Sequence, residues 1–185
     1  MLIRFVAARP SGERKDTMYY EAVSQCTRML RNIGTWLDKA EKHAAEKTFD
    51  VNILMTDRLA PDMKPFIYQV RSACDYVKGA AAFLSGQVPP KQEDNEQTIG
   101  DARARIRKTV AFAEGVSEAQ YAGASDRTIS LLSASGKQLG GKDYLLQIAI
   151  PNVYFHVAIA YAILRHNGVD IGKMDFLGPV NWIDA

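Results

Sequence analysis

A histidine and an amide lie one helical turn apart in a long uncharged stretch of the chain. Residues 144–164 contain no Asp, Glu, Lys or Arg, and Asn152 and His156 lie near the middle. The pKa of an imidazole is close to neutrality, so one positioned histidine can transfer a proton or bind a metal ion. His156 is therefore the candidate catalytic residue, although no Ser-His-Asp or Cys-His set can be assembled around it from the sequence.

The spacing of this stretch predicts that both polar side chains face a core. Residues at steps of three or four are Leu145, Ala149, Asn152, His156, Ile159 and Ile163. A buried imidazole or amide without hydrogen bonds costs about 1–3 kcal/mol, so we expect partners on a neighbouring helix. Gln69 and Asp75 are the best candidates. Hydroxyl groups for the same cluster are available from Tyr68, Tyr76 and Tyr161.

Composition narrows the class of protein. The chain has 185 residues and a formal net charge of +2, which suits one domain and gives no concentrated basic face for nucleic acid or an anionic membrane. About 20 apolar residues can span a bilayer, but Gln147, Asn152 and His156 would be costly at that depth, so we expect a core helix and no membrane partner. Cys26 and Cys74 are expected to be buried, reduced thiols in a cytoplasmic protein.

Apolar residues at helical spacing predict an all-α four-helix bundle. The four helices are expected at about 17–47, 61–85, 99–115 and 143–167. Thr98 and Asp101 predict a capping box before the third helix, and Pro151 should bend the fourth.

The segments outside the helices are predicted as follows. Residues 1–16 are expected to be a poorly ordered N-terminal extension, with Met1 and Met18 both open as the natural start, and 17–185 to be the bundle domain. A short hairpin is expected within 116–142. The apolar C-terminal tail should dock across one end of the bundle.

A phosphate-loop skeleton before the fourth helix is rejected on its chemistry. Gly136, Gly141 and Lys142 have the spacing G-x-x-x-x-G-K. Asp143 follows where Ser or Thr should offer a hydroxyl to magnesium, and its carboxylate would repel phosphate oxygens. We therefore interpret Asp143 as a helix cap.

Two stretches resemble a known family. They are RLAPDMKPFIYQVRSACDYVKG at 58–79 and PNVYFHVAIAYAILRHNGVDIGKMDFLG at 151–178. Together they resemble the uncharacterised DUF1993 family of the DinB/YfiT-like superfamily of four-helix bundles, over about residues 18–178. This resemblance implies a divalent metal held by three histidines, one on the second helix and two at i, i+4 on the last. Superfamily members include thiol-dependent transferases and isomerases.

By position, the resemblance implies Gln69, Asn152 and His156 as metal ligands. Two of the three are amides, whose oxygens are much weaker ligands for zinc or nickel than imidazole. Three interpretations stay open: a polar core without a ligand, a small-molecule pocket reusing the metal cavity, and a metal site of altered preference helped by Asp75. No cofactor follows from the sequence, and a divalent metal belongs only to the third interpretation.

The function favoured by these residues is small-molecule binding in the former metal cavity. Asp75, Tyr161 and Arg165 are expected to line that pocket. The alternative is a metal- or His156-dependent transferase or hydrolase related to thiol-dependent DinB-like enzymes. The superfamily also suggests a homodimer.

Overall fold

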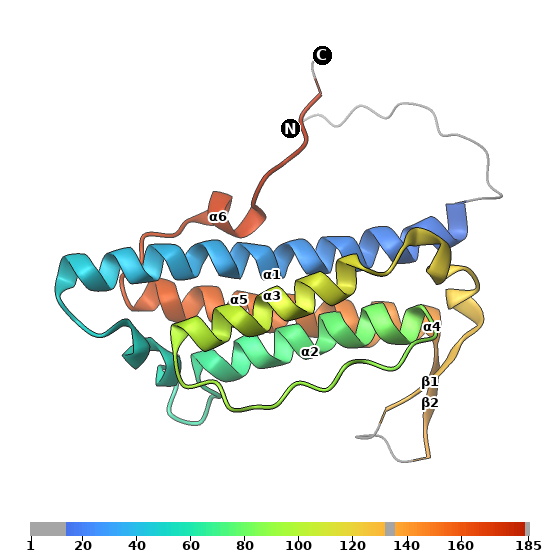
Figure 1. Cartoon of the computed structure of the whole chain (residues 1–185), viewed down its shortest axis with the longest axis horizontal. Coiled ribbons are helices and arrows are strands. Elements are labelled where there is room, and N and C mark those ends of the chain that lie inside the picture. The colour runs from blue at the N-terminus through green and yellow to red at the C-terminus, as the bar shows by residue number, and fades with distance from the viewer. Residues whose placement is uncertain (1–13, 132–135, 184–185) are drawn as a thin grey trace.

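Four long helices form one bundle (Figure 1). The computed structural model describes residues 14–131 and 136–183. The long helices are α1 (Arg14–Lys47), α2 (Phe66–Leu84), α3 (Ile99–Glu114) and α5 (Ile150–His166). Helices α3 and α5 each pack against both α1 and α2. The predicted all-α four-helix bundle is confirmed.

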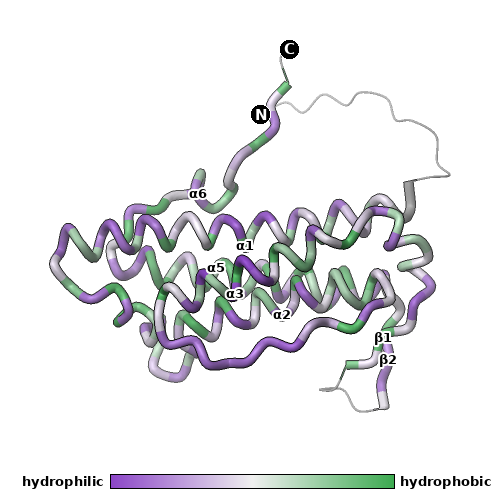
Figure 2. Tube along the Cα trace, in the orientation of Figure 1, coloured by the Kyte–Doolittle hydropathy of each residue, from purple (hydrophilic) through white to green (hydrophobic). Residues whose placement is uncertain are grey.

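Shorter elements connect the long helices. They are the 3₁₀ helices η1 (Val51–Thr56), η2 (Glu118–Tyr121) and η3 (Ala124–Asp126), the strands β1 (Thr128–Ser130) and β2 (Gln138–Gly140), the short helices α4 (Gly141–Asp143) and α6 (Lys173–Leu177), and the π-helical segment η4 (Tyr144–Ala149). The two strands pair antiparallel with Ile129 opposite Leu139, which confirms the predicted hairpin. Figure 2 shows the hydrophilic segment between α2 and α3 running along the outside of the bundle.

Two helix starts differ from the prediction. Helix α1 begins at Arg14, upstream of the predicted boundary, and residues 1–13 of the expected extension lie outside the described residues. Helix α2 begins at Phe66 after an extended N-cap at Pro65, so the predicted start at Pro61 is wrong. A residue before proline is disfavoured in the α conformation, so Pro65 prevents the helix from starting earlier.

The predicted capping box of α3 is confirmed. The Thr98 hydroxyl accepts a hydrogen bond from the Asp101 N–H at 3.1 Å, and the Asp101 carboxylate accepts one from the Thr98 N–H at 2.9 Å. Gly115 is the C-cap residue. The two hydrogen bonds between Thr98 and Asp101 therefore determine where α3 begins.

The last helix contains an extra residue before its proline. The Ile150 N–H donates to the carbonyl of Leu145, five residues earlier, as in a π-helix. Pro151 follows directly and has no N–H of its own to donate. The widened turn precedes the proline, and regular α-helix continues to His166.

Asp143 is not a helix cap. The N-cap of α4 is Gly140, and the Asp143 carboxylate accepts a hydrogen bond from the Gln147 side chain at 2.9 Å. Gly141 packs closely against η3, where a Cβ would overlap the Ala124 carbonyl oxygen. Gly141, one of the two glycines of the rejected phosphate-loop skeleton, is therefore required by this packing.

The segment Gly141–His166 is, by length and composition, long and apolar enough to cross a membrane. Here it belongs to the bundle, where Val153, Val157 and Ala160 are fully buried. One such segment is weak evidence for a membrane span, since core helices of bundles have the same composition.

The C-terminal segment docks along the side of α1, so the predicted position across one end is wrong (Figure 1). The Asn32 amide donates to the Phe176 carbonyl at 2.8 Å, and Lys39 binds the Asp175 carboxylate at 2.6 Å. Gly178 has φ +68°, and a Cβ there would lie 2.4 Å from the Asn32 side-chain oxygen. Polar side chains along α1 therefore hold the C-terminal segment in position. The periodicity of apolar residues in the sequence does not predict these contacts.

Candidate functional site

His156 meets Gln69 where α5 faces α2. The imidazole is 9% exposed, and its Nδ1 lies 2.8 Å from Oε1 of Gln69. The other end of the same amide donates to the Lys64 carbonyl at 2.9 Å. The amide nitrogen is thus used on Lys64, so its oxygen faces the imidazole and Nδ1 must carry the proton. In the neutral ring the lone pair is then on Nε2, and the predicted contact between Gln69 and His156 is confirmed.

Three aromatic rings surround this imidazole. Tyr76 stacks on it at a centroid distance of 5.9 Å and an interplanar angle of 16°. Tyr68 and Phe155 meet it edge to face at 6.1 and 5.2 Å. These two rings are 41% and 56% exposed, so the site borders the bundle surface. Among the described residues, Nε2 has no hydrogen-bond partner.

Burial also sets the charge of His156. Desolvation lowers the pKa of the imidazole below its ordinary value. The ring is therefore neutral at pH 7, with a lone pair on Nε2 that can accept a hydrogen bond or a proton. A fixed tautomer and a lowered pKa are two properties that a general base at neutral pH requires.

Asn152 does not join this cluster. Its amide donates to the carbonyl of Ile148 on its own helix at 2.7 Å, and its side chain is half-buried. The neighbouring residue Val153 and, one turn later, Val157 are fully buried. Val153 therefore occupies the core position that the sequence assigned to Asn152, and the Asn152 amide is bonded to its own helix and not to Gln69.

Comparison with known proteins assigns this bundle to a family. Residues 18–177 match the family described as Domain of unknown function (DUF1993). The chain belongs to the DUF1993 family. A crystal structure of a DinB family member protein from Shewanella denitrificans is similar at a TM-score of 0.90 and 40% identity, covering 95% of this chain and 100% of that one. The resemblance inferred from the sequence is confirmed, and no curated protein matches.

The residues of this DUF1993 protein do not fit the three-histidine metal centre that the sequence resemblance implied. The oxygen of Gln69 is bonded to His156, and Asn152 is bonded to its own backbone. Zinc and nickel prefer imidazole, thiolate or carboxylate ligands. Within residues 14–131 and 136–183 no group of three or more His, Cys, Asp or Glu side chains could hold a metal ion.

Two of the predicted pocket residues lie against the chain that follows α5. The Tyr161 hydroxyl donates to the Ile171 carbonyl and the Arg165 guanidinium to the Val169 carbonyl, both at 3.3 Å. Both contacts hold the start of the C-terminal segment. Their role in a pocket of the DUF1993 protein stays a prediction.

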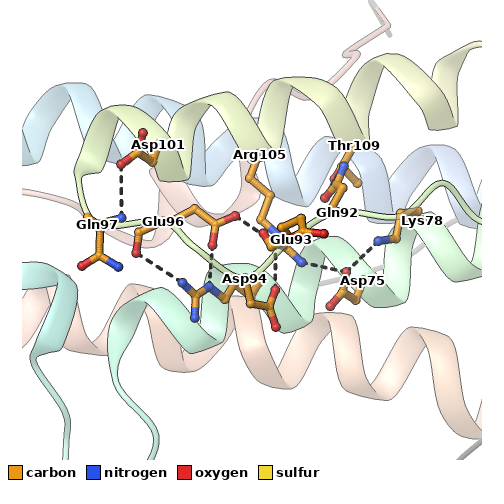
Figure 3. A network of polar contacts seen from close by, with 11 residues as sticks. Asp75, Lys78, Gln92, Glu93, Asp94, Glu96, Gln97, Asp101, Arg105 and Thr109 are labelled. Carbon is orange, nitrogen blue, oxygen red and sulfur yellow. Dashed lines mark hydrogen bonds and ion pairs between the residues drawn. The ribbon is translucent and has the colours of Figure 1, made fainter.

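Asp75 belongs to an ionic network around a buried arginine on the other side of α2, shown in Figure 3. Arg105 of α3 is 3% exposed. Its guanidinium lies 2.9 Å from carboxylate oxygens of Asp75, Asp94 and Glu96. The sequence suggested Asp75 as a partner for His156, but its carboxylate is bonded to Arg105 instead. We call the four side chains, together with Arg71, which binds Glu96, the Arg105 network.

This network attaches the loop between α2 and α3 to both helices. Burial alone would raise the pKa of Glu96, but hydrogen bonds from Arg105 and Arg71 outweigh burial and lower it. Arg105 also donates to the Glu93 carbonyl at 3.1 Å. Glu96 is therefore charged at neutral pH, although its residue is only 8% exposed.

Sequence reasoning missed the Arg105 network, although a signal was present. Arg105 lies three residues after Ala102 and four before Thr109, both fully buried, so it occupies a core position of α3. A charged residue at a core position needs a buried partner. The acidic cluster just before the helix, at 93–96, could have suggested one.

Cys26 and Cys74 are buried free thiols, as predicted. Burial raises the pKa of each thiol to about 12. Cys74 lies by Thr109 and the Arg105 network, whose charges influence it, and not beside His156. Neither thiol is a nucleophile at neutral pH, because the thiolate is the reactive form.

Proposed function

We propose that this protein binds a small molecule at His156, in the place where superfamily relatives hold a metal. The observation that carries the proposal is the hydrogen bond from Nδ1 to Gln69, which leaves Nε2 as an oriented acceptor. Tyr68 and Phe155 add partly exposed aromatic surface on either side. A ligand with a hydroxyl or N–H donor for Nε2 and a ring for these aromatic side chains matches this arrangement.

A second candidate function is transfer or hydrolysis with His156 as general base. The lowered pKa and the fixed tautomer of His156 favour it. Nε2 would take the proton of a bound thiol or hydroxyl nucleophile, while Gln69 holds the opposite side of the ring. Self-association and a cytoplasmic location, both expected from the sequence, stay predictions.

Phenol is a suitable probe for the binding proposal, because it carries one donor and one ring. We expect phenol at millimolar concentration to shift the Nε2 resonance of His156 in a nitrogen NMR spectrum, with saturation. His156→Ala should abolish binding, whereas His166→Ala, at an exposed residue near the end of α5, should leave it unchanged.

Three results would contradict the proposal. One is an Nε2 resonance that does not respond to phenol. Another is a His156→Ala variant that loses stability but binds phenol as before, which would favour a polar core without a ligand. The last is stoichiometric zinc or nickel in protein purified without an affinity tag, which would favour a metal site.

A further inference from the structure

A pocket on the other side of α2 has no role in the His156 site. It lies between α2, the loop from Gln87 to Gln97, and the hairpin, and its volume is about 450 Å³. Pockets for small molecules commonly measure about 300–1,000 Å³. We propose that this pocket binds a flat aromatic carboxylate, with the ring between aromatic walls and the carboxylate on Lys78.

Aromatic and proline side chains make the walls. Tyr76, Phe83 and Tyr144 line one side, and Pro89 and Pro90 come from the loop. The rings of Phe83 and Tyr144 meet edge to face at 5.7 Å, and Tyr144 is 2% exposed. The walls are thus packed in place before any ligand arrives. Ring surfaces of this kind favour a planar aromatic group.

Lys78 supplies the polar end of the pocket. It is 8% exposed, and its ammonium lies 2.9 Å from the Asp75 carboxylate (Figure 3). That is its one hydrogen bond among the described residues, and an ammonium has three N–H donors. Donors remain for the oxygens of a ligand, and a carboxylate makes the strongest such bonds.

The acidic residues of the pocket do not prevent an anion from binding. Asp75 and Asp94 both line the pocket, and both are bonded to Arg105 from behind. An arginine engaged by a carboxylate reduces that carboxylate's repulsion of a further negative charge. Lys91 also lines the pocket, but its side chain is 87% exposed and pairs with Glu93. Lys78 is therefore the buried cation of the pocket.

Gly79 keeps the pocket open at its wall. A Cβ at this position would lie 3.0 Å from the Tyr144 hydroxyl and 3.4 Å from the Phe83 ring. Any larger side chain must therefore push these rings or enter the pocket. Glycine in a helix interior is less favourable than most residues by up to about 1 kcal/mol, so a replacement does not weaken α2 through helix propensity.

Tyr76 separates the two proposed sites. One face of its ring stacks on His156, and the same residue lines the pocket. The carboxylate proposal uses neither Nε2 of His156 nor Gln69. The polar group that each ligand needs, the Lys78 ammonium or Nε2 of His156, therefore distinguishes the two sites.

The test uses 1-naphthoate and its uncharged analogue 1-naphthalenemethanol, each titrated into the full chain by calorimetry. We expect saturable binding of 1-naphthoate to the natural sequence. Lys78→Met should weaken 1-naphthoate about tenfold or more, through the lost charge-assisted hydrogen bond, and the alcohol less than about threefold. Lys173→Met, at an exposed lysine on α6, should change neither affinity.

Filling the pocket gives the second arm of the test. Gly79→Val from the wall and Leu131→Trp from the rim should each weaken the binding of 1-naphthoate. Leu131 is half-buried, so its variant should fold even where Gly79→Val does not. Cooperative unfolding identifies the folded variants.

The proposal is overturned by any of three results. The first is the absence of saturable 1-naphthoate binding to the natural sequence at millimolar concentration. The second is unchanged 1-naphthoate binding by folded Leu131→Trp, which places the compound elsewhere. The third is an equal weakening of acid and alcohol by Lys78→Met, which removes the carboxylate contact.

Discussion

Helix α2 presents two polar clusters on opposite sides, and they are built from different groups. Towards α5, a neutral imidazole and an amide share one hydrogen bond among aromatic rings. Towards α3, the guanidinium of Arg105 is surrounded by three carboxylates and is almost fully buried. The His156 cluster is thus uncharged, whereas the charged cluster attaches a loop.

The difference shows how burial affects neutral and charged groups. A neutral pair in a part-buried site needs one hydrogen bond to offset its desolvation, and one atom can stay free for a ligand. A buried ion needs several partners at once, because leaving it unpaired is far more costly. The His156 side therefore has a free acceptor, whereas on the Arg105 side both terminal guanidinium nitrogens are bonded and Nε is buried without a partner.

The largest expected effect is on the Arg105 side. Arg105→Met should lower the free energy of unfolding by about 3–5 kcal/mol, because it leaves Glu96 buried with only Arg71 as a charged partner. Urea denaturation measures this change.

Arg103 provides a matched control two residues away on the same helix. It pairs with Asp38 and Glu41 of α1, whose side chains are 66% and 47% exposed. Arg103→Met should therefore cost about 0–1 kcal/mol. Equal losses for the two variants would show that the Arg105 network is no more important than a surface ion pair.

A smaller effect is expected on the His156 side. His156→Ala should cost about 1–3 kcal/mol, since it leaves the Gln69 oxygen without its donor. Asn152→Ala should cost less than about 1 kcal/mol, because its amide bonds only to its own helix. Thermal or urea unfolding separates the two. Losses of similar size would instead place Asn152 in one cluster with His156.

The smallest effect is a pH dependence between about 7 and 5. Burial lowers the pKa of His156, so the unfolded chain binds a proton more readily than the folded one. Stability from the neutral imidazole is complete above the unfolded pKa of about 6.5 and falls as pH drops through the folded pKa. His156→Gln should flatten this part of the stability profile.

His166→Gln is the control for that titration, because His166 is exposed. It should keep the pH dependence of the natural sequence. A His156→Gln profile that still falls between pH 7 and 5 would assign the dependence to other groups. Asp101 and Asp175, whose pKa values are lowered by hydrogen bonds, lose their contribution only in more acidic solution.

The sequence predicts the bundle well because four long apolar stripes repeat at the helical period. It also predicts that Gln69 meets His156, since both are polar residues at inward positions of adjacent helices. It does not predict the partners of Arg105, because periodicity describes one helix at a time and the carboxylates come from another helix and a loop. The position of the tail escapes prediction for the same reason, since polar groups along α1 fix it.

The π-helical turn at Tyr144–Ala149 sets the rotational phase of everything after it. Each residue of an α-helix turns the chain by about 100°, so one extra residue re-aims the whole of α5 relative to its first turn. Asn152 and His156 both lie beyond the turn and are re-aimed together, and in the resulting phase Val153 is buried and His156 faces Gln69. A single-residue insertion in a helix can thus move a polar site sideways while every helix of the bundle keeps its place.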